Sequence, residues 1–205
     1  MSASHSAVIS TIGRGFDGLD VSALAQDLGA EFIRLEDFDA TVAAVLAEAP
    51  AAENIVAQGT GDIAFDAEVA AALGLPLAII SGAPQRTGEL AQQNAESLGA
   101  TVAGIFTDLE AVPGALASLG DVTPVMSADL FQKQLIDQAR AAGSHIVLPE
   151  GDDDRILEAA HVLLRDKVAK LTILGNEADI KARAEELKLD LAGAEIINHL
   201  ESPLA

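Results

Sequence analysis

Four carboxylates and one guanidinium lie close together in HIVLPEGDDDRIL, residues 145–157, where a strand is expected to pass into a helix. The acidic residues are Glu150, Asp152, Asp153 and Asp154, and Arg155 follows them. An aspartate can cap the helix, and the positive end of the helix dipole favours further carboxylates in the first turn. Arg155 is in the same turn, where its positive charge is unfavourable beside the positive end of the dipole. It could pair with Asp152 or Glu158, or it could bind an anionic ligand at the carboxyl edge of the sheet, a task suited to a forked guanidinium. The residues alone leave both interpretations open.

Three glycine-containing segments follow expected strands in the first half: STIGRGFDG (10–18), QGTGD (58–62) and SGAPQRTG (81–88). Their backbone N–H groups could face an anion. However, none has the GK[ST] ending of a Walker A loop, so plain turns are favoured over a nucleotide site, and Arg86 is expected to be an ordinary surface residue. No metal site is expected, because the histidines (His5, His145, His161 and His199) lack ligand spacing. The three consecutive aspartates also point in different directions.

The elements that would position these residues alternate between strand and helix patterns. Strands are predicted at residues 7–11, 31–35, 54–58, 76–80 and 101–106, separated by alanine-rich stretches with helical spacing. The second part continues with helices at 127–143, 153–166 and 176–188, and with strands at 145–148, 169–175 and 194–198. This alternation predicts an α/β protein with parallel sheets and right-handed crossovers.

Composition restricts the possible partners and compartment. The chain of 205 residues has a formal net charge of −20, which disfavours nucleic acid and anionic membranes. It has no cysteine, so disulfides and thiolate metal sites are excluded. Residues 1–13 lack the pattern of a secretory signal, and no apolar run is long enough to span a bilayer. A cytoplasmic protein is expected.

Charge also suggests a domain boundary. No lysine precedes Lys133, and residues 1–120 contain three basic residues (Arg14, Arg34 and Arg86) against 16 acidic ones. The segment PGALASLGDVTP follows, with the composition of a linker. We therefore predict a first domain at 1–112, a linker at 113–124 and a second domain at 125–205.

The second part resembles a known family. The chain from Thr123 onward is similar to the opening of the phosphate acetyltransferase catalytic domain, and residues 138–182 read QARAAGSHIVLPEGDDDRILEAAHVLLRDKVAKLTILGNEADIKA. The most specific matches are IVLPEG…R…AA at 146–160 and ILGNEADI at 173–180. Residues 1–120 resemble a reduced form of the P-loop-like accessory domain found in longer members. That likeness is best at 54–108, and the first domain is accordingly predicted to be a degenerate P-loop-like domain.

The resemblance implies an acyltransferase that moves an acetyl group between coenzyme A and inorganic phosphate. It implies coenzyme A or acetyl-CoA as a substrate, no tightly bound cofactor, no metal, and a homo-oligomer. Arg155 would contact a coenzyme A phosphate, with Glu150 and Gly151 shaping the turn beneath it.

The family's catalytic serine, arginine and aspartate lie downstream of the matched segment. The chain is therefore expected to be a fragment, an incomplete transferase domain that is inactive alone. Two alternatives remain: a regulatory or assembly module that binds a metabolite or holds subunits together, and a nucleotide-binding switch. The absence of GK[ST] disfavours the switch.

Overall fold

The computed structural model describes residues 5–198 and 201. The chain divides into two compact units, Met1–Lys133 and Gln134–Ala205. Both are built from parallel strands and helices, which confirms the predicted α/β class. In the part of the chain that is described, no helix is long and apolar enough to cross a membrane.

The first unit contains a five-stranded parallel sheet in the order β2-β3-β1-β4-β5. The strands are β1 (Ala7–Ile12), β2 (Glu31–Arg34), β3 (Ile55–Gln58), β4 (Leu77–Ser81) and β5 (Val102–Phe106). The helices are α1 (Val21–Leu28), α2 (Val42–Glu48), α3 (Ile63–Leu73), α4 (Gln85–Ser97) and α5 (Val112–Leu119), with a short 3-10 turn η1 (Leu35–Asp37). These strands lie close to their predicted positions.

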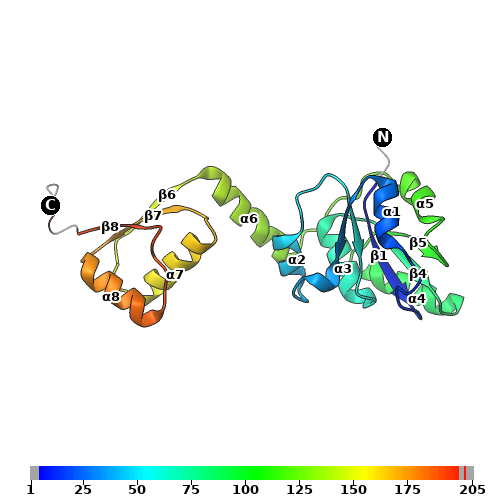
Figure 1. The fold of residues 1–205 in the computed structure, drawn as a ribbon, viewed down its shortest axis with the longest axis horizontal. Helices are drawn as coiled ribbons and strands as arrows, with labels where there is room; N and C mark the ends of the chain where they lie inside the picture. Colours follow the sequence, from blue (N-terminus) through cyan, green and yellow to red (C-terminus); the bar gives the residue numbers. More distant parts are fainter. Residues whose placement is uncertain (1–4, 199–200, 202–205) are drawn as a thin grey trace. The chain divides into compact units, whose positions relative to one another are not determined.

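Helices cover both faces of this sheet (Figure 1). Alternate residues of β1 point to opposite sides: Val8 packs with α2, α3 and α4, and Ile9 packs with α1 and α5. This double burial explains why the strands are continuous apolar runs rather than alternating patterns. Alanines on α3, such as Ala67 and Ala70, are fully buried against the sheet.

The segment predicted as a linker, 113–124, differs from that prediction. Its first seven residues belong to α5, whose Leu116 is 0% exposed within the core of the first unit. Pro113 lies in the first turn of α5, a position that tolerates proline. Its presence therefore did not mark a break between domains. Farther along, the amide of Val125 donates to the carbonyl of Ala71 at 2.8 Å. The first compact unit therefore extends past residue 124.

The second unit has a three-stranded parallel sheet in the order β6-β7-β8. Its elements are β6 (His145–Leu148), α7 (Asp154–Arg165), β7 (Lys170–Leu174), α8 (Glu177–Leu187) and β8 (Glu195–Ile197), and α6 (Ala128–Ala142) spans the unit boundary. Leu157 of α7 and Ile180 of α8 share one cluster with Leu171 and Ile173 of β7. Both helices therefore pack on the same face of the sheet, as Figure 1 shows.

Side chains on the opposite face of this sheet form a polar row. Nε2 of His145 lies 2.8 Å from Oγ1 of Thr172, which donates to Oε2 of Glu195 at 3.1 Å. These contacts join all three strands. Val147, on the same face as His145, is 55% exposed.

Asp66 is a fully buried carboxylate at the start of α3 in the first unit. It accepts hydrogen bonds from the hydroxyl of Ser10, from the amide (2.8 Å) and hydroxyl (2.9 Å) of Thr60, and from the amide of Gly61 (3.2 Å). A Cβ at position 59 would collide with this carboxylate, so Gly59 is required there. Asp66 thus fixes the turn after β3 to the end of β1. Burial raises the pKa of Asp66 above its ordinary value.

We predict that Asp66→Ala lowers the free energy of unfolding of the first unit by about 3 kcal/mol or more, because several buried donors lose their acceptor. Asp66→Asn retains the shape of the side chain and should lower the free energy of unfolding by less.

The stability of the first unit should also depend on pH through Asp66. A raised carboxyl pKa means that this group's contribution to stability is present below the ordinary pKa and is lost as pH rises through the raised value. The stability advantage of wild type over Asp66→Asn, measured by urea denaturation, should therefore shrink as pH rises from the ordinary carboxyl pKa, about 4, through the raised value. An advantage that grows with pH would contradict this account.

Candidate functional site

The carboxyl ends of β6 and β7 lie side by side at one edge of the second sheet, because the strands are parallel and adjacent. Leu148 and Leu174 end these strands, and the turns that follow lead directly into α7 and α8. This edge is where open α/β sheets bind ligands. It holds the residues that the sequence singled out.

The turn after β6 packs directly against the end of β7. The amide of Gly151 donates to the carbonyl oxygen of Leu174 at 3.1 Å. A Cβ at position 151 would lie 2.6 Å from that oxygen and 2.7 Å from Cδ1 of Ile180. Only glycine allows this approach, so Gly151 has a definite role in shaping the turn. A contact between Gly151 and a substrate stays a prediction.

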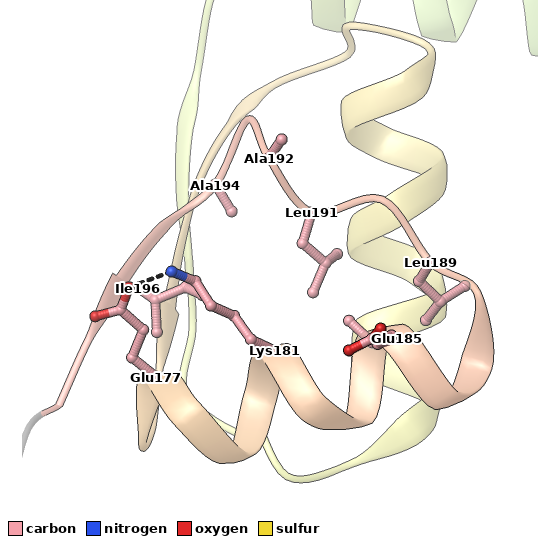
Figure 2. A pocket seen from close by; sticks show the side chains of 9 residues that line it. Glu177, Lys181, Glu185, Leu189, Leu191, Ala192, Ala194 and Ile196 are labelled. Atoms are coloured by element: carbon pink, nitrogen blue, oxygen red, sulfur yellow. Dashed lines mark hydrogen bonds and ion pairs between the residues drawn. The ribbon is translucent and has the colours of Figure 1, made fainter.

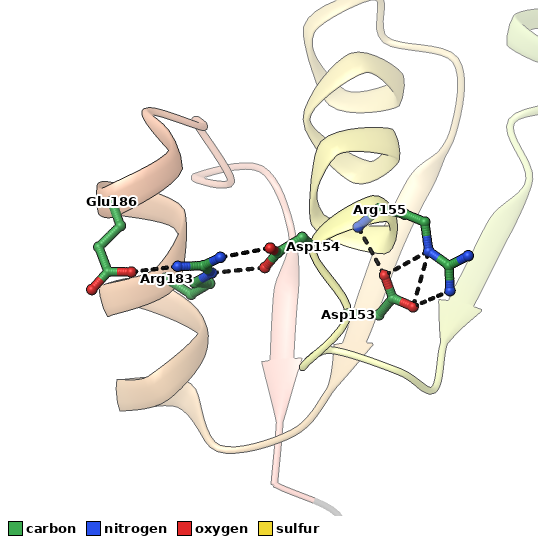
Figure 3. Close-up of polar contacts among 5 residues, drawn as sticks. All are labelled: Asp153, Asp154, Arg155, Arg183 and Glu186. Carbon is green, nitrogen blue, oxygen red and sulfur yellow. Dashed lines mark hydrogen bonds and ion pairs between the residues drawn. The ribbon is translucent and has the colours of Figure 1, made fainter.

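Arg155 pairs with the cap of its own helix (Figure 3). Asp153 is the N-cap of α7, and its Oδ1 accepts from the backbone amide of Arg155 at 2.9 Å. The guanidinium donates from Nε to Oδ1 at 3.0 Å and from Nη2 to Oδ2 at 2.5 Å. Arg155 is thus held in an ion pair, as one of the two interpretations had it, but its partner is Asp153 and not Asp152 or Glu158. Folding back onto the cap keeps the guanidinium beside a carboxylate despite the unfavourable dipole.

This ion pair lies in solvent: the Arg155 side chain is 87% exposed. The hydrogen bonds from Arg155 lower the pKa of Asp153 to about 2, and those to Asp153 raise the pKa of Arg155 above its ordinary value. Both groups are therefore charged at neutral pH. Since exposed pairs contribute little to stability, Arg155 can exchange its partner at low cost.

A second arginine joins the two helices of this edge. Arg183 of α8 donates to Asp154 of α7 through Nε (2.7 Å) and Nη2 (2.6 Å), and its Nη1 donates to Glu186 at 2.6 Å (Figure 3). The two carboxylates raise the pKa of Arg183. Sequence reasoning missed this pair because Asp154 and Arg183 are 29 residues apart, beyond any helical spacing. Their contact exists only after both helices pack on one face of the sheet.

Two depressions adjoin the turns. The first, of about 370 Å³, is lined by Pro149, Gly151, Asp152, Leu174, Gly175, Asn176, Asp179, Ile180 and Arg183. The second is shallower, measures about 750 Å³ and is lined by Glu150, Asp152, Asp153, Asp154 and Arg155. The three predicted site residues are therefore divided: Gly151 lines the first, whereas Glu150 and Arg155 line the second. Because four carboxylates surround Arg155, a phosphate can approach it favourably only if the arginine turns away from Asp153.

The other candidate motifs form no comparable site. Arg14, in the loop after β1, donates to the backbone carbonyls of Asp17 (3.0 Å) and Thr107 (3.4 Å). A Cβ at Gly13 would lie 2.6 Å from Cβ of Ala83, so the loops after β1 and β4 are in close contact. Arg86 is exposed, as expected. The degenerate P-loop character of the first domain stays a prediction.

No group of three or more acidic or histidine side chains within residues 5–198 and 201 could hold a metal ion. Of the histidines, His145 contacts Thr172, His161 contacts the backbone of Asp190, and His5 is exposed. His199 lies outside the described residues.

Comparison with known proteins finds similar proteins for the C-terminal part of the chain. Residues 130–205 match the family model described as "Phosphate acetyl/butaryl transferase". The chain is 56% identical over 78 residues to a phosphate acetyltransferase of Corynebacterium glutamicum, a match that covers 38% of this chain and 24% of that protein. It is 46% identical over 71 residues to the Bacillus subtilis phosphate acetyltransferase, with 34% of this chain and 21% of the relative covered.

The phosphate acetyltransferase of Escherichia coli is 40% identical over 74 residues, which cover 36% of this chain and 10% of that protein. A solved structure, the EutD phosphotransacetylase from Staphylococcus aureus, has 35% identity and a TM-score of 0.31, with 35% of this chain and 23% of that chain covered. The chain thus spans about a quarter or less of each of these relatives. Over residues 130–205 it is related to the phosphate acetyltransferases.

We predict that Gly151→Ala destabilises the second unit by about 1–3 kcal/mol, because the added methyl group overlaps the carbonyl of Leu174. Gly193→Ala is the matched control. A Cβ there meets only a side-chain atom of Leu164, at 3.1 Å, and that side chain can move. Urea denaturation of both variants, followed by circular dichroism, measures the difference. Equal stability of the two variants would show that the turn after β6 can relax and that the edge is not rigidly held.

Proposed function

We propose that the second unit is part of an enzyme that transfers an acetyl group between coenzyme A and inorganic phosphate. The observation that supports this most strongly is the 56% identity over 78 residues to a phosphate acetyltransferase. The location of the glycine turns at the carboxyl edge of a parallel sheet agrees with a ligand-binding role for the same segment. Coenzyme A would be a substrate rather than a tightly bound cofactor.

Acetyl transfer makes chemical demands that the edge described here does not meet alone. A phosphate oxygen must approach the thioester carbonyl, and the developing oxyanion must be stabilised by positioned donors. The smaller depression offers Asp152, Asp179, Asn176 and Arg183, but Arg183 already binds two carboxylates. The remaining acids would repel phosphate. We therefore propose that this chain alone does not catalyse the reaction.

Arg155 is the proposed contact for a phosphate of coenzyme A. A guanidinium that is mostly exposed and paired only with its own helix cap can turn outward without disturbing the core. An arriving phosphate would replace the carboxylate of Asp153 with an anion of higher charge. Glu150 and Gly151 would support the turn below. The proposal includes a cytoplasmic homo-oligomer as the working form.

An assembly module is a second candidate function, and one observation favours it. Phe131 and Leu135 are one helical turn apart on α6 and are 55% and 50% exposed. Two large apolar side chains at this spacing form a stripe suited to contact with another protein surface. In this alternative the first part of the chain, which includes the start of α6, would hold subunits together, and Arg155 would serve only its helix cap.

We predict that the purified chain forms no acetyl phosphate from acetyl-CoA and phosphate above background, because Arg183, the guanidinium of the smaller depression, is already bound by two carboxylates. The Corynebacterium glutamicum enzyme, assayed at equal concentration, provides the positive control. Free coenzyme A is followed with a thiol reagent, which the chain itself does not consume because it has no cysteine. Turnover that persists after complete removal of host enzyme would refute the prediction.

The role of Arg155 can be tested in a chimera in which the 78 matched residues of the Corynebacterium glutamicum enzyme are replaced by those of this chain. We expect Arg155→Ala to raise the KM for coenzyme A by about ten- to a hundred-fold, the effect of a lost charge-assisted hydrogen bond. The kcat should stay within a few-fold, because a remote phosphate is bound equally in the ground and transition states.

Arg165→Ala is the matched control for this experiment. Arg165 is also in α7, is exposed and pairs with a neighbouring aspartate, Asp166, but it lies at the opposite end of the helix. Its loss should leave both kinetic constants unchanged. If Arg155→Ala behaves like Arg165→Ala, the guanidinium serves only the helix cap.

A further inference from the structure

The two cations of α8 have different partners. Lys181 pairs with Glu177 at 2.5 Å, beside an apolar depression on one side of the helix (Figure 2). Arg183 is two residues farther along the chain, and residues at this spacing on a helix do not face the same side. Its guanidinium instead reaches across to Asp154 of α7. Arg183 is therefore the cation of α8 that contacts the first turn of α7.

Arg183 binds both oxygens of the Asp154 carboxylate. Nε donates to Oδ1 at 2.7 Å, and Nη2 donates to Oδ2 at 2.6 Å. The remaining nitrogen, Nη1, donates to Glu186 at 2.6 Å, which fixes the orientation of the planar guanidinium. The hydrogen bonds from Arg183 lower the pKa of Asp154, so this carboxylate is charged at neutral pH. Its negative charge is offset by a cation from a different helix.

Asp154 is also one of the carboxylates around Arg155, because both residues line the shallower depression of about 750 Å³. Arg183 lies on one side of Asp154, and the pair formed by Asp153 and Arg155 lies on the other (Figure 3). Without Arg183, Asp154 would place an uncompensated negative charge next to Arg155 and could compete for its guanidinium. Arg183 thus reduces the repulsion that an arriving phosphate meets.

We propose that Arg183 is a charge-balancing residue for phosphate binding at Arg155: it neutralises Asp154 and strengthens the binding of coenzyme A without contacting the ligand. This inference rests on the proposed function, in which Arg155 contacts a phosphate of coenzyme A. A direct contact is the competing account, because Arg183 also lines the smaller depression. Arg183 would then have to release Asp154 and Glu186. The two accounts predict different results when Asp154 is removed together with Arg183.

The affinity of the full chain for coenzyme A distinguishes them. The Kd is measured from the amide chemical shifts of residues 150–155 in the isotopically labelled chain, for wild type, Arg183→Gln, Asp154→Asn and the double variant. Arg165→Gln is the matched control, because it removes the same charge from an exposed pair with Asp166 at the far end of α7. Each titration is repeated at ionic strengths of about 0.1 M and about 1 M, between which the Debye length falls from about 10 Å to about 3 Å.

We expect Arg183→Gln to raise the Kd by about two- to fivefold at the lower ionic strength, and by much less at the higher one. Asp154→Asn should lower the Kd, because the charge of Arg183 is then no longer offset by Asp154. The double variant should return to the wild-type value, since the charges of both partners are absent. Arg165→Gln should leave the Kd unchanged.

A double variant that binds as weakly as Arg183→Gln would overturn the proposal in favour of a direct contact. An equal effect of Arg183→Gln and Arg165→Gln, or an effect independent of ionic strength, would also overturn it. The side chains of Arg183 and Asp154 are 44% and 43% exposed, so the variants are expected to fold. Urea denaturation of each variant checks this, and recovery of affinity in the double variant cannot result from unfolding.

Acetyl transfer by the chimera is measured separately. Recovery of affinity in the double variant, without acetyl transfer by the chimera, would leave the charge-balancing role standing and remove the proposed function. Acetyl transfer by the chimera, together with equal affinities of wild type and Arg183→Gln or with no binding by either, would do the reverse.

Discussion

The close approach of two backbone segments, Gly151 to the carbonyl of Leu174, determines the geometry of the whole candidate site. The hydrogen bond of 3.1 Å places the turn after β6 against the end of β7, and the 2.6 Å separation from a hypothetical Cβ leaves no room for any other residue. The start of α7 is positioned by this contact. The caps, ion pairs and depressions at this edge follow from where α7 begins.

The acidic side chains at this edge of the sheet oppose the binding of a phosphate to Arg155. Arg155 is surrounded by carboxylates, and Arg183 is bound by one of these, Asp154, and by Glu186. A pKa of about 2 for Asp153 means that protonation does not free Arg155 near neutral pH. Arg155 is released only when another anion competes with Asp153. Because the pair is highly exposed, exchanging Asp153 for that anion costs little free energy. Arg155 can thus serve both as the partner of a helix cap and as the proposed phosphate contact.

Local patterns predicted much of the fold. The apolar runs located β1, β3 and β4 because each is buried on both faces, and the acidic run located the cap of α7 because capping is a local interaction. Residues 113–119 were misjudged because proline and glycine were interpreted as a linker, whereas Leu116 packs α5 into the core. The Asp154–Arg183 pair and the hydrogen bond from Ser10 to Asp66 join residues distant in the chain. Such contacts depend on tertiary packing and leave no periodic signal in the sequence.

The central claim is that the ligand edge of this protein lies in the second sheet, at the turns after β6 and β7. Amide chemical shifts of the isotopically labelled chain, recorded during titration with coenzyme A, test it most directly. The account predicts that the largest changes occur at residues 150–155 and 175–176. Changes concentrated at residues 13–18 and 59–61 of the first unit, or no changes at all with excess ligand, would contradict it.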